Sequence, residues 1–494
     1  LGCSFLSPPI LPSSRLCCCH PLQHPSLPTM RATGRLFVGL WAVSHAAGFF
    51  IMPCSKPVVV ERADPIVNPG ALAGHVHTIM GGNGFDLSMT YEQARAASCS
   101  TCKVTADLSN YWIPTLYYQG QDGKFTSVSQ SGGMLAYYLF RQDAKDPEYN
   151  KGLIAFPQGF RMLAGDSKLR SFSDALEQRA ITYVCLGNGG PQTNGFPTRN
   201  CPNGLRLQVL FPSCWDGVNL DSPDHKSHMA YPDRLDNGKC PSTHPKRFAT
   251  LFYEVIFNVN DFKDKWYGEN DTQPFVLSNG DPTGYGLHGD FVNGWDVNVL
   301  QAAITQCKDG GGSIEKCPVF QFFDDETRRG CQVPVKVDEQ VQGQLDKLPG
   351  CNSIQRGPSN AQSESGCGAT TEISQPQWGY KDVTSTLNYK YLGCARDPSG
   401  QGRTLPSAKT SGDSMTVDTC IKHCDGKGFA YAGLEYAKEC WCGNSVADDR
   451  KPKKGLWGGC NMPCSGSQSE MCGGWAALSL YQKCNGTCQN AELI

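Results

Sequence analysis

Histidines and acidic residues of this chain gather in three short stretches, a pattern expected of a site for proton transfer or metal binding. The first stretch is residues 214–232, CWDGVNLDSPDHKSHMAYP, which carries Asp224, His225 and His228. Proline and glycine interrupt it too often for a long helix or strand, so a loop is predicted. Binding and catalytic residues concentrate in loops held by a rigid scaffold.

The two other stretches add His75 with His77, in the run GHVHT, and His288 with Asp290, in the run LHGD. Five of the ten histidines fall in the three stretches. Residues two apart in an extended strand project from the same face, so His75 and His77 are expected to point to one place. The two histidines of the loop, three residues apart, can converge in a tight turn.

Two kinds of chemistry fit these residue types. Imidazole and carboxylate groups can bind a divalent metal, although this spacing is less specific than an HExxH motif. Without a metal, two carboxylates can act as general acid and base in a glycan hydrolase, and a histidine base with a tyrosine acid would serve a lyase. The alternative is that these groups only hydrogen-bond long loops. The catalytic candidates are His75, His77, Asp224, His225, His228, His288 and Asp290, and the metal candidates are His75, His77, His225, His228 and His288.

The composition limits the class of protein. With 494 residues, 39% of them hydrophobic, the chain can form more than one domain with a core. A net charge of -2 without a long basic run gives no footprint for nucleic acid or an anionic membrane, whereas a neutral polysaccharide fits as partner. The 26 cysteines are typical of a protein that folds in an oxidising compartment, which predicts secretion.

The N-terminal residues are expected to lie outside the folded domains. Residues 1–29 are rich in proline and serine and precede Met30, so they are interpreted as an extension from a gene model or as a disordered extension. Residues 30–47 have the basic, apolar and small-residue order of a signal peptide. No later stretch reaches the ~18 consecutive apolar residues of a membrane helix, so no membrane span is predicted.

Short strands separated by Gly, Pro and Asn turns dominate from residue 48 onwards. Strands are expected, for example, at 111–118, 205–211 and 248–258, and helices at 90–97, 172–178 and 297–305. This pattern predicts a mostly β domain over residues 48–350, a β-sandwich or jelly-roll-like scaffold. Disulfides, whose pairing the sequence does not reveal, can hold its long loops. The cysteines concerned are Cys54, Cys99, Cys102, Cys185, Cys201, Cys214, Cys240, Cys307, Cys317 and Cys331.

Several long motifs in this region resemble one known family. The three stretches above, with VERADPIVNPG at 60–70, SNYWIP at 109–114 and FPQGFR at 156–161, are together similar to the fungal secreted DUF1996 family. The resemblance runs from about residue 64 to residue 301. It implies a fold unit and little about chemistry, because the family is defined by sequence and named for its unknown function.

A second domain is expected after a linker. Residues 351–388 are rich in Ser, Gln, Gly and Thr, which predicts the linker. Residues 389–484 carry YLGC, CxxxC, ECWCGN and CGG motifs with eight cysteines in order, and they resemble a WSC domain. That resemblance implies a small cysteine-rich α+β module associated with carbohydrate binding in fungal wall proteins. Cys484 and Cys488 lie beyond the pattern and are a candidate pair, and residues 485–494 form a tail.

Sugar binding by this second domain has a physical route. The apolar C–H face of a sugar can lie on an aromatic ring while polar side chains bind the hydroxyls at its edge. The candidate residues are Glu435, Tyr436, Trp441, Asn444, Trp457 and Trp475. The alternative is that most of these aromatic rings form the small core between the disulfides.

Together these observations predict a secreted fungal protein, extracellular or associated with the cell wall. Its WSC-like domain is expected to bind polysaccharide, either fungal wall glucan or chitin or a plant wall glycan. The first domain is interpreted as a hydrolase or lyase acting on that glycan, and a divalent metal is its candidate cofactor. The competing hypothesis is a non-catalytic carbohydrate-binding wall or effector protein. Two sequons predict glycosylation at Asn270 and Asn485.

Overall fold

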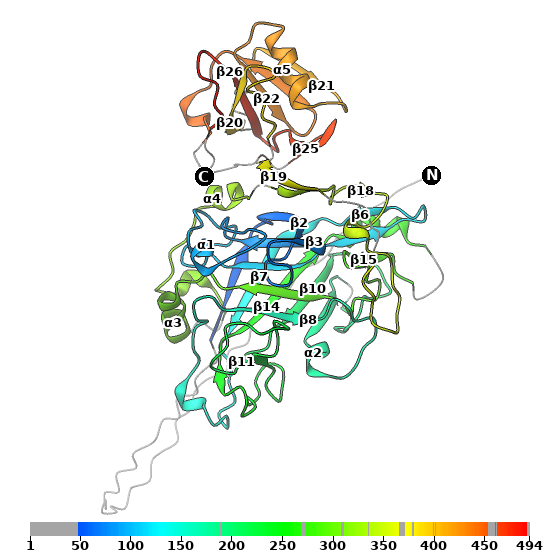
Figure 1. The fold of residues 1–494 in the computed structure, drawn as a ribbon, viewed down its shortest axis with the longest axis vertical. Coiled ribbons are helices and arrows are strands. Elements are labelled where there is room, and N and C mark those ends of the chain that lie inside the picture. The colour runs from blue at the N-terminus through cyan, green and yellow to red at the C-terminus, as the bar shows by residue number, and fades with distance from the viewer. Residues whose placement is uncertain are drawn as a thin grey trace, which may run out of the picture. The chain divides into compact units, whose positions relative to one another are not determined.

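The structure, a computed structural model of the 494-residue chain, is built mainly from strands (Figure 1). It describes residues 48–187, 189–267, 272–307, 311–333, 335–364, 371–377, 380–398, 400, 402–452, 460 and 462–491. The mostly β class and the small cysteine-rich C-terminal module are confirmed. Short helices lie around the outside of the N-terminal strands: α1 (Tyr91–Arg95), α2 (Leu176–Arg179), α3 (Val297–Gln306) and α4 (Asp325–Gly330).

Two five-stranded antiparallel sheets form the body of the N-terminal domain. The order in the first sheet is β1 (Phe49–Cys54), β7 (Gln130–Leu139), β14 (Thr250–Phe257), β10 (Leu205–Leu210) and β9 (Ile181–Cys185). The order in the second sheet is β2 (Val59–Ala63), β3 (Leu72–Gly81), β4 (Asn110–Pro114), β16 (His288–Val292) and β8 (Arg161–Gly165). Strands far apart in sequence therefore become neighbours.

The inner faces of the two sheets share one hydrophobic core. Tyr138 of β7 and Tyr253 of β14 meet Tyr111 of β4 and Phe291 of β16 there. The ring centroid of Tyr111 lies 5.8 Å from that of Tyr253 and 5.5 Å from that of Phe291. Side chains of two sheets that fill a common core define a β-sandwich.

The outer face of the second sheet is covered as well. Ile79 of β3, Trp112 of β4 and Val292 of β16 pack in a second hydrophobic cluster together with loop residues. Because side chains alternate along a strand, His77 and Asp290, each two positions from a member of this cluster, also belong to the outer face. Polar groups are therefore placed on a face that is largely buried.

Smaller sheets complete the N-terminal domain. One has the order β15 (Phe275–Leu277), β5 (Leu116–Gln119), β6 (Phe125–Ser127) and β18 (Gln344–Leu345). Another has the order β12 (Met229–Ala230), β11 (Cys214–Trp215) and β13 (Lys246–Arg247), and β17 (Val335–Asp338) pairs with β19 (Thr371–Gln377). The loop of residues 214–232 thus begins in β11 and ends just beyond β12, whose pairing closes its base.

The elements expected from sequence occur with shifted ends. The strand expected at 111–118 is divided into β4 and β5, which belong to different sheets. Pro114 lacks the N–H that would continue the ladder, and the N–H of Thr115 instead donates to Val76 at 3.1 Å. The expected helices correspond to α1, α2 and α3, and α3 begins where the Asp296 side chain accepts hydrogen bonds from two backbone N–H groups.

All ten cysteines singled out in this domain form disulfides. The pairs are Cys54–Cys102, Cys99–Cys331, Cys185–Cys201, Cys214–Cys240 and Cys307–Cys317. Cys214–Cys240 closes the region that contains the loop of residues 214–232, and Cys99–Cys331 joins segments 232 residues apart. The disulfides therefore hold long loops on the sandwich.

Part of the segment expected as a linker packs against the N-terminal domain. The Asn352 side chain donates to the carbonyl oxygen of Gly74 at 2.9 Å, and the N–H of Gln355 donates to that of Gly280 at 3.1 Å. Further along, β19 forms strand pairs with β17. A segment of polar composition can pack in this way because its backbone and amide groups supply the hydrogen bonds.

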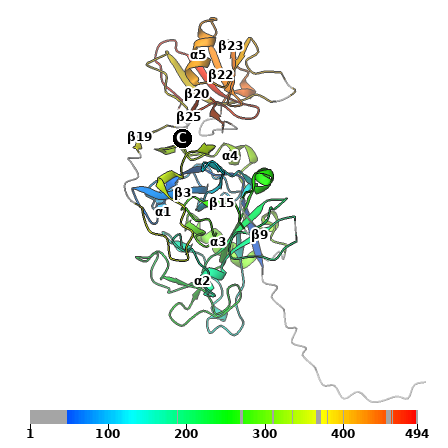
Figure 2. The same cartoon turned by 90° about the vertical axis from the view of Figure 1, so that its right-hand side faces the viewer.

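The described residues of the C-terminal domain form a five-stranded sheet with an α-helix beside it (Figure 2). The sheet order is β20 (Tyr389–Arg396), β26 (Ala477–Lys483), β22 (Tyr431–Glu435), β23 (Glu439–Gly443) and β21 (Ala408–Ser411), with α5 (Val417–Asp425) beside it and the small pair β24 (Pro463–Cys464) and β25 (Ser467–Met471). Cys420–Cys440 and Cys424–Cys442 tie α5 to β23, and Cys394–Cys460, Cys464–Cys472 and Cys484–Cys488 are also paired. These disulfides cross-link the small core that the sheet and the helix share.

Candidate functional sites

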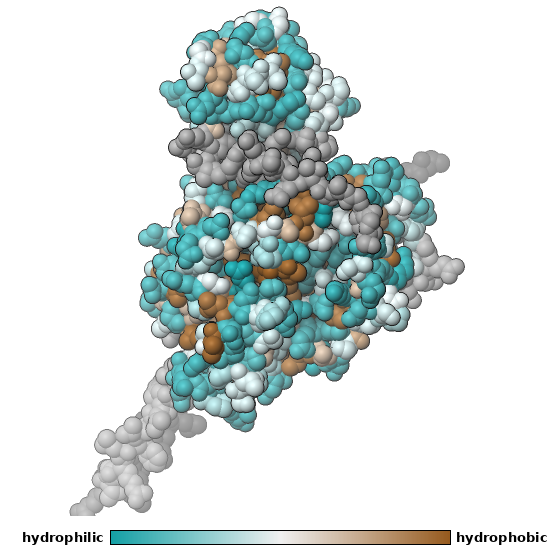
Figure 3. All heavy atoms as spheres, in the orientation of Figure 1, coloured by the Kyte–Doolittle hydropathy of each residue, from teal (hydrophilic) through white to brown (hydrophobic). Residues whose placement is uncertain are grey.

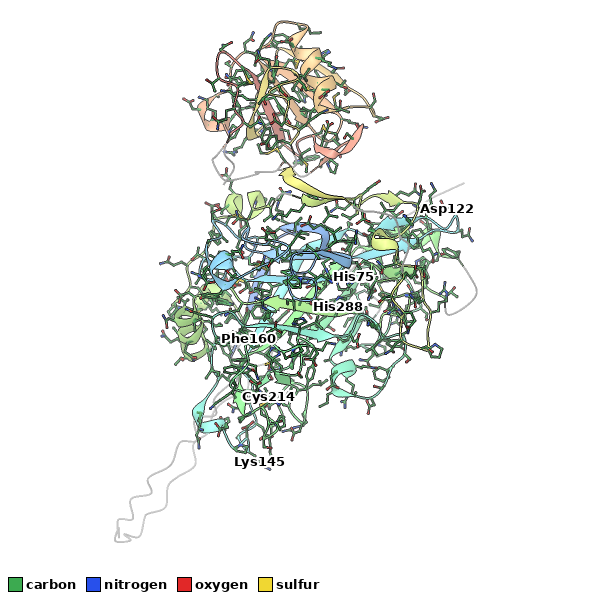
Figure 4. All side chains as sticks on the ribbon, in the orientation of Figure 1. His75, Asp122, Lys145, Phe160, Cys214 and His288 are labelled. Atoms are coloured by element: carbon green, nitrogen blue, oxygen red, sulfur yellow. A yellow bond between two sulfur atoms is a disulfide. The ribbon has the colours of Figure 1, made fainter. Side chains whose placement is uncertain are left out.

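Three histidine side chains meet on the outer face of the second sheet, and Figure 4 labels two of them, His75 and His288. His75 and His77 come from β3, and His288 is the first residue of β16. The Nε2 atom of His288 lies 3.0 Å from Nε2 of His75 and 3.4 Å from Nε2 of His77. The ligand atoms of all three rings lie within 4.8 Å of one another. We call this group the histidine cluster.

The sheet topology explains how the cluster forms. Strand β4 separates β3 from β16, so the two backbones are about 10 Å apart and their imidazoles must lean over β4 to meet. His77 pairs in register with Pro114 at the end of β4.

Backbone carbonyls fix the tautomers of two rings. The Nδ1 atom of His77 lies 3.0 Å from the carbonyl oxygen of Ala63, and Nδ1 of His288 lies 3.0 Å from that of Gly286. A carbonyl oxygen only accepts, so each Nδ1 carries a proton and each Nε2 presents a lone pair. His77 and His288 therefore direct lone pairs toward each other.

Burial keeps the histidines neutral. His77 is fully buried and His288 is 3% exposed, whereas His75 is half-buried and reaches solvent. Burial lowers the pKa of His77 and of His288 to about 4. It also lowers the pKa of His75 well below its usual value, and the other two histidines add to this effect. Solvent therefore meets the cluster at His75.

Carboxyl groups lie beside the cluster. Asp64 interacts electrostatically with His288 and accepts hydrogen bonds from the backbone of Ile66 and Val67, both at 3.0 Å. Asp290 shares its face of β16 with His288 and is fully buried, and within the described part of the chain neither of its carboxyl oxygens has a hydrogen-bond partner. Burial, with the nearby Asp64, raises the pKa of Asp290 well above its usual range.

A cleft of about 510 Å³ lies beside β8, the strand that neighbours β16 in the second sheet. Two of its wall residues, Gly165 and Leu163, pair in register with His288 and Asp290. Its wall also includes Leu176, Asp224, Lys226, Met229, Tyr231 and Tyr285. Mixed apolar and polar walls of this kind are typical of ligand sites. Figure 3 shows hydrophobic residues gathered near the middle of the otherwise mostly hydrophilic face seen in that view of the N-terminal domain.

The two histidines of the 214–232 loop do not converge on one point. His228 contacts the Ser222 hydroxyl through Nδ1 at 2.8 Å and the carbonyl oxygen of Arg161 through Nε2 at 2.9 Å. His225 contacts the Asp221 carboxylate through Nδ1 at 2.8 Å. Both ring nitrogens of His228 are thus used to hold the loop against β8, and the cluster contains neither histidine.

Asp224 also organises this loop. Its carboxylate accepts hydrogen bonds from the hydroxyl of Ser222 at 2.8 Å and from the backbone N–H of Ser227 at 2.9 Å. These donors, together with the Ser227 hydroxyl and the N–H of Lys226, hold the pKa of Asp224 below its usual range. Asp224 is exposed and stays ionised at the rim of the cleft.

The C-terminal domain contains a second candidate site, a cavity of about 410 Å³. Tyr436 and Trp475, both singled out from the sequence, line it and are 46% and 71% exposed. Their ring centroids are 6.0 Å apart. We call this space the aromatic cavity. Large exposed aromatic side chains in a concave site are characteristic of ligand contact rather than of a core.

Charged groups line the same cavity. The Arg403 guanidinium donates to Asp397 at 2.7 Å and also to Glu435. Burial, with the nearby Asp397, raises the pKa of Glu435 to about 7. Sequence reasoning identified Glu435 but missed Asp397 and Arg403, because their separations along the chain form no motif.

Two cationic side chains cover the ring of Trp441. The Arg403 guanidinium lies 4.1 Å and the Lys409 ammonium 4.4 Å from its ring centroid. The indole N–H donates to Glu439 at 3.1 Å. Cations over an aromatic ring compete with a sugar for its face, so Trp441 is less available than Trp475.

The remaining sequence candidates are dispersed. The Asn444 side chain accepts a hydrogen bond from the backbone of Ala430 at 2.9 Å and is exposed. Trp457 lies outside the described residues, as does the sequon residue Asn270. Asn485 is exposed near the end of the described chain.

Fold and sites together define a mainly β protein with a disulfide-held sandwich domain and a small cysteine-rich domain. Residues 64–295 match the model of the family described as domain of unknown function DUF1996. Residues 391–474 match the model of the WSC domain. The resemblance inferred from the sequence is thereby confirmed for both parts. Within the described residues, no helix has the length and apolar character needed to cross a membrane.

Curated relatives resemble only part of the chain. A WSC domain-containing protein of Arthroderma benhamiae is 31% identical over 123 residues, which are 25% of this chain and 13% of the relative. A second WSC domain-containing protein of that species is 35% identical over 107 residues, or 21% of this chain and 14% of the relative. Kremen protein 2 of Homo sapiens is 33% identical over 112 residues, or 23% of this chain and 24% of the relative. The chain thus spans less than a quarter of the length of each of these relatives.

Proposed function

We propose that this chain is an extracellular carbohydrate-binding protein and that its WSC domain holds the glycan in the aromatic cavity. The observation that carries the proposal is the exposed pair of Tyr436 and Trp475 in a cavity that also contains carboxylates and a guanidinium. The match to the WSC model supports it. The disulfides in both domains support an oxidising, extracellular setting.

The cavity offers both kinds of contact that a sugar needs. The C–H face of a pyranose ring can stack on Trp475 or Tyr436, which present flat apolar area. Asp397, Glu435 and Arg403 can bind hydroxyl groups at the sugar edge. With a pKa of about 7, Glu435 can serve as donor or acceptor near neutral pH. Neutral polysaccharides carry both features, so they are the proposed ligands.

Replacing Tyr436 and Trp475 together by alanine is expected to weaken binding to insoluble glycan about 5- to 160-fold, because each aromatic contact contributes about 0.5–1.5 kcal/mol. Depletion isotherms with β-glucan, chitin and plant wall polysaccharides measure this. The matched control is Tyr149→Ala, which removes a surface aromatic of the N-terminal domain that is 37% exposed. Unchanged affinity in the double variant, or equal losses in the control, would remove the aromatic cavity from the proposal.

A second candidate function is cleavage of the bound glycan by the N-terminal domain, as a hydrolase or lyase. The observation that favours it is the cleft beside β8, two of whose wall residues, Gly165 and Leu163, are the cross-strand neighbours of His288 and Asp290. His75, which reaches solvent, would be the member of the cluster that the substrate contacts. The WSC domain would then raise the local concentration of glycan for its neighbour.

Under this second function, His75→Ala is expected to lower the release of soluble sugars from the same polysaccharides at least about 100-fold, within the range typical of a general acid or base. Binding to insoluble glycan should stay unchanged, because the WSC domain is untouched. His244→Ala is the matched control, since His244 belongs to another loop, where it contacts Thr243 and the backbone of Ser227. Binding without product release by the unmodified chain would favour the non-catalytic wall or effector protein.

Further parts of the proposal concern the chain's processing. Residues 30–47 are proposed to direct secretion as a signal peptide. Asn270 and Asn485 are proposed glycosylation sites. The fold units are proposed to span 48–350 and 389–484 with a connecting segment at 351–388, and the protein to reside outside the cell or in the cell wall.

A further inference from the structure

We propose that the histidine cluster of the N-terminal domain binds one divalent transition-metal ion through the Nε2 atoms of His75, His77 and His288. One ring nitrogen from each histidine lies within 4.8 Å of those of the other two, although the residues come from two strands that are not adjacent in the sheet. The site is separate from the aromatic cavity of the WSC domain. Either site can therefore fail its test without affecting the other.

The three rings of the cluster have too few protons among them to satisfy their Nε2 lone pairs, so a cation fits here. The Nδ1 protons of His77 and His288 are used on the carbonyl oxygens of Ala63 and Gly286. Only His75 can then place an N–H among the three neutral Nε2 atoms, and it can satisfy one lone pair. The Nε2 atoms of His77 and His288, 3.4 Å apart, would then have no proton between them. Unsatisfied buried acceptors are costly, and a cation would satisfy all three nitrogens at once.

The distances suit a small metal ion. Zinc lies about 2.0–2.1 Å from an imidazole nitrogen, so two ligand atoms of a tetrahedral site are about 3.3 Å apart. The Nε2 atom of His288 lies 3.0 Å from that of His75 and 3.4 Å from that of His77. Two of the three ligand separations therefore match those of a tetrahedral zinc site.

The outer contacts of the rings are those that metal-binding histidines commonly use. Such histidines donate their second N–H to a carbonyl or carboxylate, which orients the ring. Gly286, whose carbonyl orients His288, donates its own N–H to the Asp281 carboxylate at 2.6 Å. Asp281 is paired in the interior with Arg170 at 3.7 Å. A chain of buried polar contacts thus holds the ligand in place.

Charged and titratable groups surround the cluster. Asp64 interacts electrostatically with His288, and the carboxyl group of Asp290 lies two positions beyond His288 on β16. Lys226 also acts on His288. The two arginines that act on His75 are already paired, Arg62 with Glu339 and Arg170 with Asp281.

The number and type of ligands indicate the class of site. Three imidazole ligands suit zinc, copper, iron or nickel better than calcium or magnesium. Sites with three protein ligands and solvent access are typical of catalytic zinc, which leaves a position for water or substrate. A second group of possible ligands, Cys420, Cys424 and Cys440, has no such role because all three cysteines are in disulfides.

The test uses the full chain stripped with a chelator and titrated separately with Zn²⁺ and Cu²⁺. Calorimetry and elemental mass spectrometry should find one ion per chain for at least one metal. His75→Ala should weaken binding more than about 100-fold, since loss of an outer partner alone costs 10–100-fold. His75 is half-buried, so this variant is expected to fold, and circular dichroism checks that it does. For copper, nitrogen hyperfine splitting in the electron paramagnetic resonance spectrum should report imidazole ligands.

Two controls make the outcome decisive. His244→Ala should bind the metal as the unmodified chain does, because its ring contacts other partners. The Tyr436→Ala, Trp475→Ala variant should also keep the metal even where it loses glycan. No saturable binding of either ion by the folded chain would overturn the proposal, as would equal affinity in folded His75→Ala and unmodified protein.

Discussion

Replacing Cys99 and Cys331 by alanine is expected to lower the free energy of unfolding of the N-terminal domain by about 5 kcal/mol. This disulfide spans 232 residues, the longest separation among the disulfides described in the structure. In the chain-entropy view, a cross-link that closes a longer loop removes more freedom from the unfolded chain. Both cysteines are buried in the cluster that covers the outer face of the second sheet.

The Cys307–Cys317 disulfide supplies the matched control, because it spans only 10 residues of the same domain. Its removal should cost about 3 kcal/mol by the same relation. Urea unfolding, with hydrogen exchange of β3 to isolate this domain, gives both values. Equal losses in the two variants would show that loop length does not govern the stability of this domain.

Arg170→Met is expected to lower the free energy of unfolding by about 3–5 kcal/mol, because it leaves the Asp281 carboxylate buried without its cation. Both side chains are fully buried, and Nε of Arg170 lies 3.7 Å from Asp281. The guanidinium also donates to the carbonyl oxygens of Asn279 at 2.8 Å and Gln355 at 2.9 Å. One residue thus joins three segments of the domain.

Arg234→Met is the control for this variant. The Arg234–Asp143 ion pair lies at the surface, where the arginine side chain is 64% exposed, so its loss should cost no more than about 1 kcal/mol. Denaturant unfolding measures both variants.

Because the Asp281 carboxylate accepts a hydrogen bond from the N–H of Gly286, Arg170→Met should also speed hydrogen exchange near His288. A loss as small as that of Arg234→Met would contradict the assigned role of Arg170.

Local features of the fold were largely predictable because they depend on near neighbours in the chain. The helix expected at 297–305 is α3, and its start is set by Asp296, which accepts from the backbone of Asn298 and Val299. The strand expected at 111–118 was harder to place. Its division into β4 and β5 depends on which sheet each half joins, which alternating hydrophobicity does not indicate.

The candidate sites, too, were predictable only where near neighbours in the chain define them. Alternation along β3 was enough to place His75 and His77 on one face, and aromatic residues between cysteines were enough to indicate Tyr436 and Trp475. The loop histidines were grouped with them on residue type and on their three-residue spacing. In the structure His225 contacts Asp221 of its own loop, and His228 contacts Ser222 and the backbone of β8, which the spacing does not indicate.

By itself, the sequence determined two recognisable domains, a cysteine content suited to disulfides and the shared face of His75 and His77, whereas the disulfide pairs came only with the structure. Only the tertiary structure decided that His288, 211 residues beyond His77, completes the cluster. It also decided that Asp397 and Arg403 join Glu435 in the aromatic cavity. The physical reason is that strand order and register are set by burial of the whole core, so residues meet across strands at separations that no local spacing encodes.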